Sequence, residues 1–228
     1  MLRLLFIFAL AGMAAQTARA ADIRVKAPAA PIDAGAPFSW TGLYLGINGG
    51  YSWGSSSWSD PSLGVASGNF GVEGALVGGQ IGYNWQRGPV VLGVETDADW
   101  LNGKGSIAEG GVCTVAGGGE CRTSQSWIGT TRGRVGYAFG YWMPYITAGA
   151  AYGDVQVADA LGTQSTTRLG WSAGAGVEVG FLRNWSAKVE FLHLDLGTAT
   201  FFDAASGGKS LSVPLKDDLV RAGISYHW

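Results

Sequence analysis

The amino-acid sequence predicts an all-β fold: an eight-stranded, antiparallel, up-and-down transmembrane β-barrel with a charged, filled lumen. Three observations predict it. Segments of alternating apolar and polar residues recur along the chain, aromatic residues gather at the two ends of these segments, and the connections alternate between long and tight. The composition agrees, because 38 glycines and 10 tryptophans accompany only 14% charged residues. The glycines have no three-residue period, which argues against a collagen-like chain.

Residues 1–20 are predicted to be a secretory signal peptide. A basic residue near the start precedes an apolar run over residues 4–11, which is too short to span a membrane as an anchor. A small–x–small site at 18–20 follows, so we expect cleavage after Ala20, with Ala21 as the alternative.

The exported chain divides into a tether and a barrel. Residues 21–39 contain three prolines and no sustained pattern, which predicts a periplasmic Pro/Ala-rich tether, and residues 40–228 are expected to form the barrel. Removal of Arg3 and Arg19 lowers the basic residues from 15 to 13 against 17 acidic residues, a net charge of −4. Nucleic-acid binding is not expected, since no basic patch is visible.

The first four predicted strands cover residues 40–53, 73–86, 90–100 and 126–138. Their apolar faces are alternate residues of 43–53, 75–85, 90–100 and 127–137. Glycine, small polar and charged residues fill the opposite faces, as expected for strands with lipid outside and a narrow lumen inside.

The last four predicted strands cover residues 142–154, 167–181, 185–196 and 219–228. The fifth has the weakest pattern, with Ile146, Ala148, Ala150 and Tyr152 as its outer face. The sixth and eighth alternate cleanly, whereas the seventh loses its alternation at residues 192–195, where we expect a β-bulge.

The connections set the orientation. The links at 53–73, 101–125, 154–166 and 196–217 are long, and those at 86–89, 139–142 and 182–184 are tight. Bacterial barrels of this kind have short periplasmic turns and longer external loops, so four external loops and three short periplasmic turns are expected.

With these strand directions, the aromatic residues form two girdles, as amphipathic rings do at membrane interfaces. The predicted periplasmic girdle comprises Trp40, Tyr83, Trp85, Tyr137, Trp142, Trp185, Tyr226 and Trp228. The predicted outer girdle comprises Tyr51, Trp53, Trp100, Trp127, Tyr152 and Trp171. A water-soluble, lipocalin-like barrel is the alternative, but it would point its charges outward and would leave the girdles unexplained.

Five motifs resemble one family as a set: SWTGLYLGINGGYSWG (39–54), GGQIGYNWQRG (78–88), TTRGRVGYAFG (130–140), WSAKVEFLHLDLG (185–197) and VRAGISYHW (220–228). The chain resembles the small eight-stranded outer-membrane proteins of Gram-negative bacteria, the porin-like, opacity-type proteins, and among them the outer-membrane immunogenic proteins. The resemblance implies the cell outer membrane as location and a structural or surface-antigen role, with haem binding in a few members. It supplies no catalytic motif.

The closing strand carries the signal that the resemblance assigns to the barrel-assembly machinery. Its apolar face ends on two aromatic residues and comprises Val220, Ala222, Ile224, Tyr226 and Trp228. The other expected partners are outer-membrane lipid and lipopolysaccharide, together with a periplasmic or peptidoglycan contact through residues 21–39.

Ten charged residues are predicted to face the lumen. The acids are Glu95, Asp97, Asp99, Glu178 and Glu190, and the bases are Arg132, Arg134, Arg168, Lys188 and Arg221. An internal salt-bridge network is expected, because an unpaired charge in a closed lumen would be costly. The alternative is an ion or proton path, as charges at membrane depth are often functional.

Cys113 and Cys121 lie in the second external connection of an exported chain, and a disulfide between them is predicted. A metal site would need further ligands, and neither histidine is near in sequence.

The two histidines carry little signal. His227 is expected to face inward near the periplasmic end, and His193 lies near the outer end. A hydrolase arrangement of His193 with Asp195 and Ser206, or haem ligation by His193, is the alternative, but no spacing supports either.

No enzyme, catalytic residue, metal or cofactor is expected. The predicted function is a structural barrel that supports the envelope and displays surface loops, with loop-mediated haem binding or adhesion and a narrow porin as alternatives.

Overall fold

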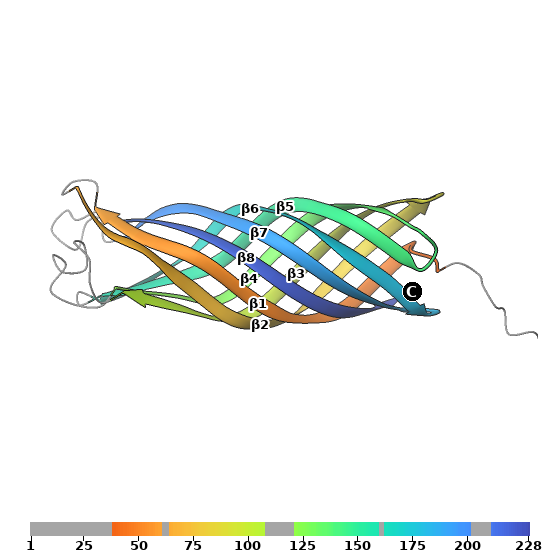
Figure 1. The fold of residues 1–228 in the computed structure, drawn as a ribbon, viewed down its shortest axis with the longest axis horizontal. Helices are drawn as coiled ribbons and strands as arrows, with labels where there is room; N and C mark the ends of the chain where they lie inside the picture. Colours follow the sequence, from red (N-terminus) through yellow and green to blue (C-terminus); the bar gives the residue numbers. More distant parts are fainter. Residues whose placement is uncertain (1–37, 61–63, 108–120, 160–161, 202–210) are drawn as a thin grey trace, which may run out of the picture. The chain divides into compact units, whose positions relative to one another are not determined.

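The computed structural model describes residues 38–60, 64–107, 121–159, 162–201 and 211–228. These residues form one closed barrel in which every strand pairs antiparallel with the next and β8 pairs with β1 (Figure 1). The strands are β1 (Gly42–Asp60), β2 (Val65–Arg87), β3 (Val90–Ile107), β4 (Cys121–Tyr137), β5 (Trp142–Asp159), β6 (Gly162–Leu182), β7 (Trp185–Phe201) and β8 (Leu211–His227). The predicted eight-stranded up-and-down barrel is confirmed.

Tight turns join the strands at the periplasmic end. Gly88 and Pro89 connect β2 to β3, and Arg183 and Asn184 connect β6 to β7. Gly88 has a φ of 61°, a left-handed conformation that glycine adopts without strain. The three short turns therefore fall where the sequence predicts them.

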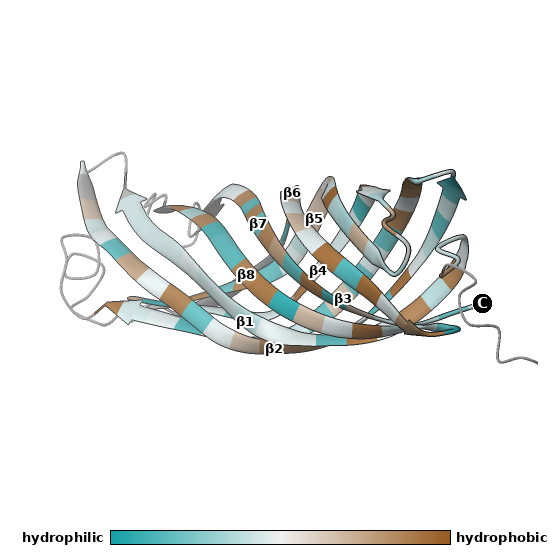
Figure 2. Cartoon of the chain, turned by 45° about the vertical axis from the view of Figure 1, so that its right-hand side comes forward, coloured by the Kyte–Doolittle hydropathy of each residue, from teal (hydrophilic) through white to brown (hydrophobic). Residues whose placement is uncertain are grey.

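The membrane-spanning part is apolar outside and polar inside. Bands of hydrophobic and hydrophilic residues alternate along the strands in Figure 2, as the period of two requires. Exposed rings such as Trp85, Trp142 and Trp185 lie toward the periplasmic end, and Trp53, Trp100 and Trp171 toward the outer end. The lipocalin-like alternative is therefore wrong for this part of the barrel.

The strands extend well beyond the outer girdle. They are 17 to 23 residues long, whereas a transmembrane strand needs only about 9–11 residues. Most of the residues expected in long external loops are thus strand residues. For example, β1 continues to Asp60 and β2 begins at Val65, so little chain remains between them. Segments 61–63, 108–120, 160–161 and 202–210 lie outside the described residues.

At the outer girdle, where Trp171 pairs with Asp195 of β7, and beyond it, the polarity of the two faces is exchanged. Leu192, Leu194 and Leu196 of β7 face the lumen and are at most 2% exposed, while His193 and Asp195 between them face outward. From the outer girdle outward, headgroups and water replace hydrocarbon around the barrel, so apolar side chains are more stable inside and polar ones outside. The alternation of β7 therefore continues where its failure was predicted.

The expected bulge at residues 192–195 is consequently wrong. Leu192 to Asp195 pair in unbroken register with Leu219 to Lys216 of β8, and the register shifts only between Asp195 and Thr198. Gly197, with a φ of 67°, lies within that irregularity.

An apolar cluster fills the outer half of the lumen, and we call it the outer core. It comprises Trp58, Phe70, Val72, Leu76, Leu101, Cys121, Ile128, Ala151, Val155, Val157, Leu192, Leu194, Leu196, Val213, Leu215 and Leu219. Every strand except β6 contributes at least one residue to it. Burial on this scale stabilises the outer part of the barrel wall.

A second cluster, the periplasmic plug, closes the other end of the lumen. It comprises Phe38, Trp40, Val91, Met143 and Tyr145. Trp40 is 0% exposed and donates from its indole Nε1 to the carbonyl oxygen of Gly140 at 3.3 Å. Its predicted place in the lipid-facing girdle is therefore wrong, because the chain before β1 turns into the barrel mouth. Phe38, expected in the tether, is also buried there, at 5% exposure.

Inward glycines make room for two lumen tyrosines. A Cβ on Gly82 of β2 would overlap the ring of Tyr44, and a Cβ on Gly176 of β6 would lie 2.7 Å from the ring of Tyr145. Both tyrosines are buried and extend across the lumen toward the charged residues described below. Glycine on the inner face thus permits large side chains to fill a narrow barrel.

Candidate functional site: the charged layer of the lumen

Two arginines organise the buried charges between the periplasmic plug and the outer core. Arg132 of β4 contacts Glu95 and Asp97 of β3 at 2.8 Å each and Glu190 of β7 at 3.0 Å. Arg221 of β8 reaches across the lumen to Asp97 at 2.7 Å and donates from Nε to Glu190 at 2.9 Å. The planar guanidinium group suits such multiple carboxylate contacts.

Arg221 also binds the third acid of β3. Its Nη1 lies 2.7 Å from Oδ2 of Asp99. The two residues are 122 positions apart in sequence, and period-two alternation alone places both inside.

Glu95 is the most heavily contacted carboxylate. Besides Arg132, it accepts from Lys188 Nζ, at 2.8 Å to each of its two oxygens, and from the Tyr44 hydroxyl at 2.8 Å. The Tyr44 oxygen in turn accepts a hydrogen bond from Arg134 at 3.0 Å. Burial of such a group is tolerable only when its oxygens are satisfied in this way.

Glu178 of β6 forms the periplasmic side of the network. It contacts Arg134 Nη2 at 2.6 Å and accepts from the Ser186 hydroxyl at 2.6 Å. His227 lies 2.8 Å from Ser186 and faces inward near the periplasmic end, where its phase predicts it. The guanidinium carbon of Arg134 lies 4.0 Å from the ring centroid of Tyr145, a cation–π contact.

Nine of the ten predicted residues therefore meet, and we call them the charged layer. They are Glu95, Asp97, Asp99, Arg132, Arg134, Glu178, Lys188, Glu190 and Arg221. All are at most 4% exposed. The predicted charged lumen is confirmed, and its charged layer contains five acids and four bases rather than five of each.

The tenth residue, Arg168, lies apart from them. It is buried and points into the outer half of the lumen, where it donates to the carbonyl oxygens of Gly197 at 3.2 Å and Val213 at 2.8 Å. Sequence phase places it inside correctly but cannot give its height along the barrel.

The lumen also contains Tyr44, Tyr145 and Asp217, which are not among the predicted lumen residues. Tyr44 and Tyr145 donate into the charged layer, and Asp217 of β8 accepts from Gln125 at 2.8 Å on the inner wall. Aromatic character predicts an outward girdle position, whereas the phase of Tyr44 and Tyr145 along their strands predicts an inward one, and the phase is the signal that identifies them. The predicted last strand begins at Leu219, which leaves Asp217 at the end of the predicted loop.

His193 lies on the outer face and pairs with Asp218 rather than with Asp195. Its Nδ1 is 2.7 Å from Asp218, and its ring lies 5.5 Å from that of Trp171. Asp195 instead lies 3.5 Å from Lys216, and Ser206 falls outside the described residues. The described ranges contain no group of three metal-ligating side chains and no helix long and apolar enough to cross a membrane.

Cys121 begins β4 and is fully buried in the outer core. Its predicted disulfide partner, Cys113, lies outside the described residues. The disulfide therefore stays a prediction.

The barrel, its apolar outer band, its two girdles and the charged layer define an outer-membrane β-barrel protein. A model of the family described as outer membrane protein beta-barrel domain matches residues 6–227. The chain belongs to this family, and it lies in the outer membrane of a Gram-negative bacterium.

Relatives agree with this assignment. The chain is 40% identical over 237 residues to the 31 kDa outer-membrane immunogenic protein of Brucella melitensis biotype 1, with 95% of this chain and 96% of that protein covered. It is 35% identical to the 22 kDa outer membrane protein of Rhizobium leguminosarum bv. viciae, covering 82% of this chain and 77% of that one.

One solved structure shows the same fold at low identity. The outer membrane protein OprG of Pseudomonas aeruginosa matches with a TM-score of 0.51 and 14% identity, covering 84% of this chain and 99% of that chain. At this identity, the likeness concerns the fold alone.

Proposed function

We propose that this protein is a structural component of the outer membrane that supports the envelope and displays its external connections, without catalysing a reaction. One observation carries the proposal: the lumen is filled in three successive layers, the periplasmic plug, the charged layer and the outer core. Such a barrel is a rigid body in the bilayer rather than a water-filled channel.

The outer core gives the display role a physical basis. A paired barrel wall with an apolar interior continues beyond the outer girdle, so the external connections begin on a folded extension rather than at the membrane surface. The naming of the relatives as immunogenic proteins supports exposure of such segments at the cell surface.

Three expected partnerships remain part of the proposal. The lipid-facing wall is suited to outer-membrane lipid and lipopolysaccharide, and the closing strand to the assembly machinery. Its Tyr226 ring packs against Trp185 and Trp228 at centroid distances of 5.2 and 5.0 Å, which keeps the aromatic end of the strand ordered. A contact of residues 21–39 with a periplasmic partner or peptidoglycan is the third.

An epitope insertion tests the display role. A short epitope inserted within residues 202–210 should be detected by antibody on intact cells, whereas the same insertion between Arg183 and Asn184 should require permeabilised cells.

A gene deletion tests the support of the envelope. Deletion of the gene should raise sensitivity to detergent and bulky antibiotics, and expression of the wild-type chain should restore resistance.

The alternatives give different results. An unchanged envelope in the deletion strain, together with saturable binding in an absorbance titration with hemin, would replace the structural role by loop-mediated haem binding. Lipid turnover by the purified protein would replace it by an enzymatic role.

A further inference from the structure

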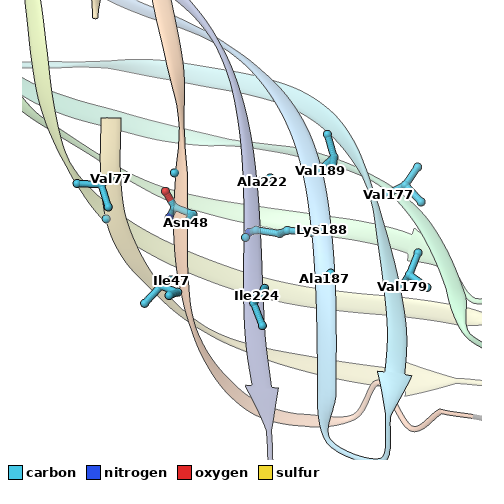
Figure 3. Close-up of a pocket in the computed structure, with 13 residues that line it drawn as sticks. Ile47, Asn48, Val77, Val177, Val179, Ala187, Lys188, Val189, Ala222 and Ile224 are labelled. Carbon is cyan, nitrogen blue, oxygen red and sulfur yellow. The ribbon is translucent and has the colours of Figure 1, made fainter. Parts of the chain in front are cut away.

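A groove crosses the lipid-facing wall over β2, β1, β8, β7 and β6 (Figure 3). Its volume is about 720 Å³, and its floor is formed by small residues at neighbouring positions, Gly49, Ala222 and Ala187. Its sides are branched apolar residues, including Ile47, Val77, Val189 and Ile224. All of these lie between the two aromatic girdles, where hydrocarbon surrounds the barrel.

The groove continues to the periplasmic girdle. A second depression of about 650 Å³ shares Ile47 and Ile224 with the first and extends to Trp185, Tyr226 and Trp228. Amphipathic rings of this kind lie at the level of lipid headgroups. One continuous apolar surface therefore runs from the middle of the membrane to the periplasmic interface.

An exposed cation lies close in sequence to Trp185, which lines the aromatic end of the groove. Arg183 is exposed in the β6–β7 turn, two residues before Trp185, and within the described part of the chain it forms no ion pair. A guanidinium at this position can bind a phosphate group. We propose that the groove holds an acyl chain of a phospholipid from the periplasmic leaflet, whose phosphate binds Arg183.

A second copy of this chain fits the groove less well. In a two-fold dimer the same patch faces itself, so one hollow would face another and leave a void. A flexible acyl chain can follow the floor and fill the space. Since lipid is apolar as well, the preference for this site comes from van der Waals packing and from the phosphate contact.

Two glycines on different walls give a matched pair of variants. A Cβ on Gly49 would come no closer than 3.5 Å to the Leu76 carbonyl oxygen, and one on Gly133 of β4 no closer than 3.9 Å to that of Ala148. Both positions face lipid, so Gly49→Leu fills the groove and Gly133→Leu adds the same side chain elsewhere. Ala222→Leu is the second groove-filling variant if Gly49→Leu does not fold, as judged by its heat-dependent gel shift.

The measurement is photocrosslinking of the full-length barrel in vesicles that contain phosphatidylethanolamine with a diazirine on one acyl chain. In the wild type, labelled peptides should come mainly from β1, β7 and β8. Gly49→Leu should reduce this labelling by about threefold or more through lost chain contacts, and Gly133→Leu should leave it unchanged. Arg183→Gln should weaken it without changing the gel shift.

Two outcomes would overturn the proposal. Even labelling around the barrel would mean that only ordinary surrounding lipid contacts this face. Protein–protein crosslinks that Gly49→Leu abolishes would identify a second copy as the occupant. Neither result bears on the display role, which is tested separately on intact cells.

Discussion

Arg221 is the residue on which most of the charged layer depends. It contacts Asp97, Asp99 and Glu190, which lie on two other strands. Replacement by leucine would leave these carboxylates buried with fewer partners, and we expect Arg221→Leu to lower the free energy of unfolding by about 3–5 kcal/mol. Urea titration of the detergent-folded protein, followed by tryptophan fluorescence, measures this loss.

A surface arginine serves as the control for this prediction. Arg87 is exposed at the end of β2, so Arg87→Leu should change the unfolding free energy by less than about 1 kcal/mol. Equal losses in the two variants would show that the charged layer contributes no more to stability than an exposed charge.

At this scale, the sequence predicts which wall a residue faces but not its height along the lumen. Period-two alternation places Arg132 and Arg168 inside together, yet only Arg132 belongs to the charged layer, because strand tilt and register decide which residues share a level. The prediction for Trp40 is wrong for a related reason. Its aromatic character suits a girdle and a plug equally, and only the path of the chain before β1 distinguishes them.

Among the elements, β7 shows how one strand serves two environments. Its phase is constant, but Lys188 and Glu190 fill the inner face in the middle of the membrane, and Leu192 and Leu194 fill it near the level of the outer girdle. In the sequence, this exchange of polarity looks like a loss of the alternation between apolar and polar residues. The predicted strands are therefore shorter than the observed ones. They end near the girdle, where the alternation of lipid-facing apolar and inward polar residues ends.

The outer part of β7 supplies the second stability prediction. Leu194 is fully buried in the outer core, so Leu194→Ala should cost about 2–5 kcal/mol of unfolding free energy. His193→Ala, on the outer face of the same strand, should cost less than about 1 kcal/mol, since its pair with Asp218 is solvent-accessible.

Hydrogen exchange by mass spectrometry checks the element directly. Amides of residues 192–196 and 213–218 should be protected in detergent micelles, as paired strands are, and Leu194→Ala should accelerate their exchange more than that of the membrane part. Rapid exchange of these residues in the wild type would indicate loops there, and would remove the folded extension from the proposed display role.

In the whole molecule, the three layers act in series along one narrow lumen. The periplasmic plug, the charged layer and the outer core each fill a different height, so opening one of them leaves two others across any path. Wild-type protein in planar bilayers should therefore show no discrete conductance steps, and neither should Trp40→Ala, which removes the largest side chain of the plug. Flotation with liposomes confirms insertion in each case.

Arg132→Ala distinguishes the structural interpretation of the charged layer from an ion path. If the layer is structural, this variant loses unfolding free energy and still does not conduct, because the plug and the outer core remain. A conductance in the wild type that Arg132→Ala alters at unchanged stability would instead make the layer an ion path.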